Sequence, residues 1–247
     1  MTDILHVKKT DAIEEVILNR PERLNALNQP LADKLLTYFE SKRRDISTRV
    51  IVIGGEGRAF CSGADLKAMG SPERLQDGPN GDWTLRDTLK AMRSCPQPIV
   101  ALVQGAAAGG GLAIAICADV IVAGETAAFH PAFIKIGLSA SELGVSWRLQ
   151  RMIGVSRARE MLLTGRPMKA EEALACGLVA RVVPDAELRT KGAELATEML
   201  RAAPDALRIS KRTFDATLEI ANFDAALELE ERGQIQMIRQ QRFGNSD

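Results

Sequence analysis

The positions of apolar and polar residues follow two periods along the first half of the chain. Residues 31, 32, 35, 36 and 39 are apolar, which is helical spacing, whereas 49–54 is a short β-branched run that ends in glycine, as a buried strand does. Strands and helices alternate with short connections, which predicts ββα or βαβ units in one α/β core. The pattern predicts strands at 13–18, 49–54, 99–103 and 119–123, and helices at 31–41, 85–92, 105–117 and 156–163.

Two loops interrupt this core, and the rest of the chain is mostly helical. Residues 71–82 hold two prolines, two glycines and few apolar side chains, which predicts a mobile loop. A second loop is expected over 129–145. Long amphipathic segments then follow, with a break near residue 200. We therefore predict a core over 1–198 and a C-terminal helical region over 199–247.

Composition narrows the possible functions. The 247 residues hold 32 Lys and Arg against 32 Asp and Glu, and a protein that neutralises phosphates usually has a basic excess, so no nucleic-acid partner is expected. No apolar stretch reaches the 18 or more residues of a membrane helix, and the N-terminus lacks a signal-peptide pattern. We expect a soluble, cytoplasmic protein with no membrane partner.

The cysteines and histidines do not indicate a metal site. The four cysteines form no CxxC pair, and the chain has two histidines, His6 and His130. Scattered thiols suit a reducing compartment. We expect the cysteines, including Cys61 and Cys117, to pack as small apolar residues rather than act as nucleophiles.

Two glycine-bearing segments, 61–65 and 109–111, each lead towards a helix. The first N–H groups of a helix are unpaired, and two such groups from separate loops can converge on one oxygen as an oxyanion hole. That arrangement suits a thioester carbonyl that becomes an enolate or a tetrahedral oxyanion. The alternative is that the glycines allow tight packing of helix against strand.

The sequence does not match other known glycine and serine motifs. Residues 105–111 follow a strand, but their spacing is G-x-x-x-G-G-G rather than G-x-G-x-x-G, with no acidic residue about 20 positions later. The chain has neither a P-loop nor a G-x-S-x-G elbow, and a serine triad would have to use one of two histidines with no obvious placement.

Several motifs occur in a fixed order between residues 4 and 215. They are NRPERLNAL at 19–27, FCSGADLK at 60–67, the glycine triplet at 109–111, CAD at 117–119, LTGR at 163–166 and the segment 173–179. Together they resemble the enoyl-CoA hydratase/isomerase (crotonase) superfamily.

This resemblance implies a spiral of ββα units with a C-terminal helical trimerisation region, assembled as a trimer or a dimer of trimers. It implies an acyl-CoA thioester substrate and no cofactor beyond the coenzyme A of that substrate. It assigns the oxyanion hole to the N–H groups of Ala64 and Gly110. It places coenzyme A along Arg23, Leu24, Ala26, Ala64, Asp65, Leu66 and Lys67.

The chain departs from the family pattern where hydratases carry two glutamates. The corresponding positions here are Ala113 and Ala132, and alanine cannot transfer a proton. Some isomerase-like members carry an acidic residue further along, and Glu142 falls at that position. One carboxylate facing the acyl chain could perform a 1,3-proton shift through a dienolate. Alternatively, Glu142 caps the helix that follows it.

Further residues complete the expected site. His130 is a second candidate base, or a loop histidine bonded to backbone. Trp147, Phe133 and Leu138 are candidates for the acyl pocket, although the first two suit a core equally well. The arginines at 148, 151, 157 and 159 are interpreted as a solvated or interface face.

The end of the chain also departs from the family. The last family helix, with its basic, aromatic tail, is expected to be shortened or missing here. We therefore expect an acyl-CoA isomerase or an atypical hydratase that uses Glu142. The alternatives are a hydrolase or decarboxylase of another CoA thioester, and a protein that binds acyl-CoA without catalysis.

Overall fold

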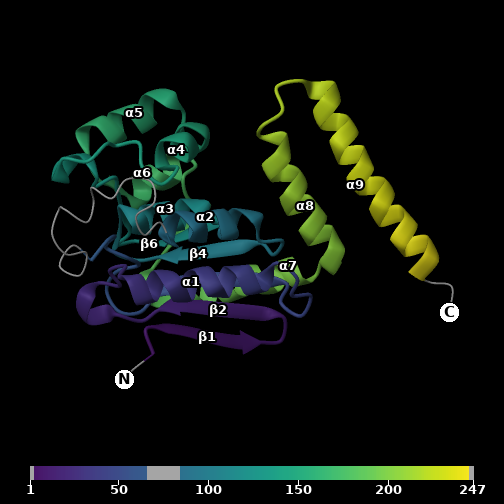
Figure 1. Cartoon of the computed structure of the whole chain (residues 1–247), viewed down its shortest axis with the longest axis horizontal. Helices are drawn as coiled ribbons and strands as arrows, with labels where there is room; N and C mark the ends of the chain where they lie inside the picture. Colours follow the sequence, from purple (N-terminus) through teal and green to yellow (C-terminus); the bar gives the residue numbers. More distant parts are fainter. Residues whose placement is uncertain (1–2, 66–83, 245–247) are drawn as a thin grey trace.

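The computed structural model describes residues 3–65 and 84–244, so the predicted loop at 71–82 lies outside the described residues. Its main feature is a six-stranded sheet with the order β1-β2-β3-β4-β6-β9 (Figure 1). The first two strands pair antiparallel, and the other neighbours pair in parallel, so the carboxyl ends of β2, β3, β4, β6 and β9 share one edge. The strands are β1 (Leu5–Thr10), β2 (Ile13–Leu18), β3 (Val50–Gly55), β4 (Ile99–Val103), β6 (Val120–Gly124) and β9 (Arg181–Val183).

A second, three-stranded sheet has the order β5-β7-β8. It corrects one prediction, because the helix expected over 105–117 begins only at Gly110, and the residues before it are extended. The cause is non-local: the Cys61 N–H donates to the Ala106 carbonyl (3.0 Å), and the Ala108 N–H donates to the Cys61 carbonyl (2.9 Å). The strands are β5 (Ala106–Ala108), β7 (Ala128–His130) and β8 (Met168–Lys169).

Helices cover both faces of the six-stranded sheet. Because successive strand side chains point to opposite faces, Ile51 and Ile53 of β3 join the larger core cluster with α1, α2 and α3. Val50 and Val52 instead pack in the smaller cluster that includes residues of α7. The helices of the core are α1 (Gln29–Lys42), α2 (Thr84–Ser94), α3 (Gly110–Cys117), α4 (Val145–Ile153), α5 (Val155–Thr164), α6 (Ala170–Ala175) and α7 (Leu188–Leu200).

A buried polar cluster joins β2 to α1. Glu14 is buried and accepts hydrogen bonds from Tyr38 Oη (2.8 Å), Thr48 Oγ1 (2.7 Å) and Lys42 Nζ (3.0 Å). Burial by itself raises the pKa of Glu14, but the hydrogen bonds outweigh it and hold that pKa below its usual value. The carboxylate is therefore satisfied in its charged form.

The C-terminal region is a pair of helices, α8 (Pro204–Thr217) and α9 (Phe223–Gly244), that pack on each other beside the core (Figure 1). Two ion pairs attach α8 to the core: Arg93 to Asp215 (2.7 Å) and Lys211 to Asp119 (2.8 Å). The predicted boundary at residue 198 falls in the last turn of α7, and the division into two domains stays a prediction. Six large apolar side chains in the described part of this pair and its turn are exposed, namely Phe214, Leu218, Phe223, Leu227, Ile235 and Ile238.

Candidate active site

Two backbone segments, residues 61–65 and the start of α3, meet beside β5. The Leu27 N–H donates to the Gly63 carbonyl (2.7 Å), and the Asp65 N–H donates to the Leu27 carbonyl (2.8 Å), which makes a parallel bridge between Leu27 and Ala64. In this parallel bridge Leu27 makes both hydrogen bonds, so the N–H of Ala64 points away from Leu27. The Ala64 N–H accordingly has no hydrogen-bond partner among the described residues.

The start of α3 supplies a second unpaired donor. The Gly110 N–H lies in the first turn, where the helix offers it no carbonyl, and it has no partner within 3–65 and 84–244. Gly109 precedes it with φ of +50°, a conformation that costs little only for glycine. A Cβ placed on Gly63 would lie 2.7 Å from the Ala108 carbonyl oxygen and 3.6 Å from Gly110 N. Glycine at 63 therefore lets the two segments adjoin.

The alternative role of these glycines, which is to allow tight packing of a helix, applies to a different glycine of the triplet. A Cβ on Gly111 would lie 2.3 Å from the Cys61 carbonyl oxygen, so α3 can approach the 61–65 segment only with glycine there. At Gly110 the same Cβ would meet the ends of the Leu85 and Leu27 side chains, at 2.8 and 2.9 Å. Within the triplet, Gly111 therefore allows close packing, and Gly110 provides an unpaired N–H donor.

Two residues that the motif analysis did not single out hold the first segment in place. Asn25 is buried; its Oδ1 accepts from the Arg20 N–H (2.8 Å), and its Nδ2 donates to the carbonyls of Glu56 (2.9 Å) and Ala59 (2.8 Å). The Arg20 guanidinium pairs with Asp65 (2.9 Å). The sequence signal that could have identified Arg20 and Asn25 is that both are polar residues inside the 19–27 motif.

The residues expected to contact coenzyme A form one loop region next to these donors. Arg23 is exposed, Leu24 is half-buried with φ of +51°, and Ala26 is buried. The Ser62 N–H donates to the Leu24 carbonyl (2.9 Å), which ties this loop to the 61–65 segment. Of the remaining predicted contacts, Asp65 is held by Arg20, whereas Leu66 and Lys67 lie outside the described residues.

Glu142 lines a cavity of about 530 Å³ between α2, α3 and α4. Its neighbour Leu143 lies near the start of α3, since Leu143 Cδ1 would be 3.9 Å from a Cβ on Gly110. Glu142 is half-buried, and its Oε1 accepts from the Leu143 N–H (3.2 Å). The side chain does not cap α4, whose N-cap is Gly144 with no side-chain hydrogen bond. The other lining residues are Arg86, Leu89, Lys90, Arg93, Ile116, Cys117, Leu143, Gly144, Trp147 and Arg148.

The two alanines at the expected glutamate positions lie in different surroundings. Ala113 is fully buried within α3, and Ala132 is half-buried just after β7. His130 lies at the end of β7, where its carbonyl accepts from the Gly109 N–H (3.0 Å). Burial and then the Lys135 charge lower the pKa of its imidazole, which favours the neutral ring near pH 7.

The three residues expected in the acyl pocket lie in different surroundings. Trp147 lines the cavity with Glu142, and the Arg151 guanidinium stacks 4.0 Å from the centre of its ring. Phe133 is buried in the core beside Gly109, with a ring carbon 3.8 Å from a Cβ placed there. Leu138 is 46% exposed and does not line this cavity. Of the arginines expected on a solvated or interface face, Arg148 is half-buried, and its Nε donates to the Ile116 carbonyl (2.9 Å) at the end of α3.

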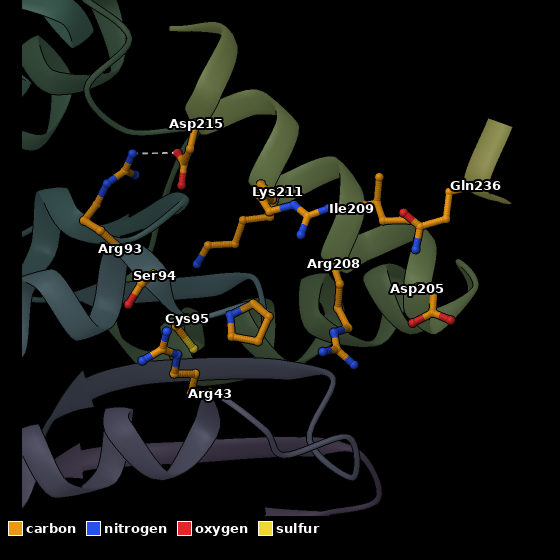
Figure 2. A pocket seen from close by; sticks show the side chains of 12 residues that line it. Arg43, Arg93, Ser94, Cys95, Asp205, Arg208, Ile209, Lys211, Asp215 and Gln236 are labelled. Carbon is orange, nitrogen blue, oxygen red and sulfur yellow. Dashed lines mark ion pairs between the residues drawn. The ribbon is translucent and has the colours of Figure 1, made fainter. Parts of the chain in front are cut away.

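The cysteines are buried or half-buried thiols. Burial raises the pKa of Cys61 to about 12 and that of Cys117 to about 11, so neither is a thiolate at neutral pH. Across the described part of the chain, no three His, Cys, Asp or Glu side chains are grouped so that they could hold a metal ion. A second cavity, of about 520 Å³, lies between the core and α8 and contains none of the predicted site residues (Figure 2).

A sequence model of the family described as enoyl-CoA hydratase/isomerase matches residues 8–246. The chain belongs to the enoyl-CoA hydratase/isomerase family. Among its relatives, the Probable enoyl-CoA hydratase EchA12 of Mycobacterium tuberculosis is 39% identical over 229 residues, which cover 90% of this chain and 80% of that protein. The family resemblance seen in the motifs is therefore confirmed.

Solved structures named as an enoyl-CoA hydratase and as an enoyl-CoA isomerase share this fold. The enoyl-CoA hydratase of Bacillus anthracis superposes with a TM-score of 0.90 at 29% identity, covering 96% of this chain and 92% of that one. A monofunctional enoyl-CoA isomerase from M. smegmatis gives a TM-score of 0.79 at 36% identity, covering 92% and 99%. The predicted crotonase-type α/β core with a C-terminal helical region is confirmed. Within the described residues, no helix is both long and apolar enough to cross a membrane.

Proposed function

We propose that this member of the enoyl-CoA hydratase/isomerase family moves the double bond of an unsaturated acyl-CoA, with Glu142 as a single acid/base. The observation that supports this most directly is the composition of the cavity next to α3. Glu142 is the only carboxylate among the described residues that line it, while both hydratase positions are alanine. One carboxylate is sufficient to remove a proton and return it.

The proposed reaction converts a 3-enoyl-CoA to a 2-enoyl-CoA. The N–H groups of Ala64 and Gly110 donate to the thioester oxygen. The Glu142 carboxylate removes a proton from C2, and the electron pair delocalises into a dienolate whose negative oxygen these donors stabilise. The same carboxyl group then protonates C4, and the double bond lies between C2 and C3. Loss of one such donor costs on the order of 3 kcal/mol in the barrier. No cofactor is needed beyond the coenzyme A of the substrate.

Coenzyme A would bind at the loops that flank these donors. The supporting observations are the exposed Arg23, the hydrogen bond between Ser62 and Leu24, and the Arg20–Asp65 ion pair that fixes the 61–65 segment. His130 is retained as a second candidate base, because its backbone adjoins Gly109 and its ring is neutral near pH 7. The proposed contacts are Arg23, Leu24, Ala26, Ala64, Asp65, Leu66 and Lys67.

Hydration is the second candidate function. It is favoured by the M. tuberculosis relative, named a probable enoyl-CoA hydratase, and by the B. anthracis structure. With alanine at 113 and 132, Glu142 or His130 would have to activate the water alone. This requirement makes isomerisation the function that the site chemistry supports better.

We also propose that the protein forms a trimer or a dimer of trimers. The exposed apolar side chains of α8 and α9 and the turn between them support it, because burial against a second copy would remove that apolar surface from water. Sedimentation velocity of the purified protein measures the assembly directly. A monomer at micromolar concentration would contradict this proposal.

The proposed activity is tested by incubating the protein in deuterated water with 2-enoyl-, 3-enoyl- and 3-hydroxyacyl-CoA esters and following each thioester by mass spectrometry. We expect a shifted double bond with deuterium incorporated, slowed at least about 100-fold in Glu142→Gln. Glu171→Gln, on the exposed face of α6, is the matched control and should retain the rate. A gain of one water would establish hydration instead, and no change in any thioester would refute both functions.

A further inference from the structure

The cavity that contains Glu142 extends along α3. Leu143 lies near Gly110 at the start of the helix, whereas Ile116 and Cys117 line the cavity at its end. Seven helical steps of 1.5 Å separate Gly110 from Cys117, or about 10 Å. An acyl group whose thioester lies at Gly110 would therefore place its far end near the C-terminus of α3.

Basic side chains line this cavity, and two of them, Arg93 and Arg148, lie near Cys117 at its far end. Residues 86, 89, 90 and 93 fall on one face of α2 by helical spacing, and three of the four are basic. Arg86 and Lys90 are exposed at the rim, whereas Arg93 and Arg148 are half-buried. Glu142 is the only acidic residue among the described residues that line this cavity, whereas four lining residues are basic; one of these, Arg93, also lines the neighbouring cavity and pairs with Asp215 there.

The two inner guanidinium groups are only partly paired. Arg148 donates from Nε and Nη2 to the carbonyls of Ile116 (2.9 Å) and Ala118 (3.4 Å). Arg93 pairs through Nη2 with Asp215, the contact drawn in Figure 2, but its Nη1 is buried without a hydrogen-bond partner among the described residues. Burial and then the charge of Arg93 lower the pKa of Arg148, as expected for two cations close together.

We propose that the acyl group bound in this cavity ends in a carboxylate, which Arg93 and Arg148 bind at the end of α3. The proposal rests on the proposed function, because that function places the thioester at Ala64 and Gly110. A carboxylate accepts charge-assisted hydrogen bonds from guanidinium groups and offsets the repulsion between them. A terminal methyl group would leave the buried N–H of Arg93 unpaired.

The length of the cavity limits the substrate class. An extended acyl chain advances about 1.3 Å per carbon–carbon bond, since such bonds are about 1.5 Å long. About eight bonds thus span the 10 Å along α3, and the arginine side chains reach part of that distance. The substrates that fit are CoA thioesters of dicarboxylic acids with roughly six to eight carbons.

The test compares the binding of two saturated thioesters, suberyl-CoA and octanoyl-CoA, by isothermal titration calorimetry. They have the same chain length and cannot isomerise, so no turnover is required. We expect suberyl-CoA to bind at least about tenfold more tightly. Arg93→Gln and Arg148→Gln should each remove most of this preference while leaving octanoyl-CoA affinity within about twofold. If Arg148→Gln loosens α3, Arg148→Lys serves instead, because it keeps the positive charge. Arg148→Lys should retain part of the preference for suberyl-CoA.

Two controls separate ligand binding from other effects. Arg208→Gln removes a cation from the neighbouring cavity and should leave the preference unchanged. Asp215→Asn breaks the ion pair of Arg93 but keeps the arginine, so the preference should persist or increase. Loss of the preference in Asp215→Asn, or octanoyl-CoA binding as tightly as suberyl-CoA to the wild type, would overturn this inference alone. If neither thioester binds, the proposed function itself is refuted.

Discussion

Asn25 is expected to be the most sensitive polar residue of the 19–27 loop. Its side chain is buried and makes three hydrogen bonds that join residues 20, 56 and 59, and its φ is +54°. Replacing it should loosen the loop that we propose for coenzyme A and the start of the 61–65 segment together. The predicted effect is therefore a loss of stability accompanied by a raised KM for the thioester.

The magnitude follows from the groups left unpaired. Truncation leaves the Arg20 N–H and the carbonyls of Glu56 and Ala59 without their partner, at about 1–3 kcal/mol for a fully buried group and less where water can enter. Only the bond to Ala59 is fully buried, so we expect a loss of about 3 kcal/mol for Asn25→Gly. Alanine is also strained at positive φ, which adds about 1 kcal/mol for Asn25→Ala.

The assay is urea unfolding at fixed protein concentration, with the free energy of unfolding taken from the midpoint and slope. The matched control is Asn28→Ala, which removes the N-cap bond to the Leu31 N–H (3.1 Å) and should cost about 1 kcal/mol. If Asn25→Ala loses no more stability than Asn28→Ala, the reasoning from buried hydrogen bonds is wrong. If Asn25→Gly is less stable than Asn25→Ala, the argument from φ is wrong.

Three further predictions concern the glycine triplet, the loss of stability at acid pH and the reactivity of the thiols. Gly111→Ala should destabilise the protein far more than Gly110→Ala in thermal unfolding, because its Cβ meets a backbone oxygen at 2.3 Å rather than the ends of flexible side chains. The pKa of Glu14 is lowered in the folded protein, so its contribution to stability is full above the unfolded pKa of about 4.3 and is lost as pH falls through the folded pKa. Unfolding free energies measured from pH 7 to pH 3 should therefore fall less steeply in Glu14→Gln. Of the four cysteines, Cys176 should react first with a thiol reagent at pH 8, and rapid labelling of Cys61 in the folded protein would contradict its burial and its pKa of about 12.

Regular elements with a strong local pattern were predictable from the sequence. The strands at 13–18 and 99–103 have the predicted bounds, and α1 extends the predicted helix by two residues at its start and one at its end. The extended conformation of 106–108 was not predictable, because it depends on hydrogen bonds to Cys61 and pairing with β7. A run of alanines favours a helix until distant backbone groups compete for its N–H and carbonyl groups.

The candidate site was predictable where backbone motifs define it. The resemblance identified the segments of Ala64 and Gly110, and the structure brings these segments together. The positions of Arg93 and Arg148 beside the cavity that contains Glu142 were not predictable, because they depend on how α2, α3 and α4 pack. Nothing in the local sequence distinguishes these arginines from those on an exposed helix face.

The two unpaired donors of Ala64 and Gly110 belong to the main chain, so no substitution other than proline deletes them. Side chains from α2, α4, the segment before α4 and the end of α3 line the neighbouring cavity and can vary without removing those donors. Recognition of a carbonyl oxygen and selection of the rest of a substrate are therefore physically separable in this protein. A chain of this architecture can therefore change the side chains around its cavity while it keeps the same two backbone donors.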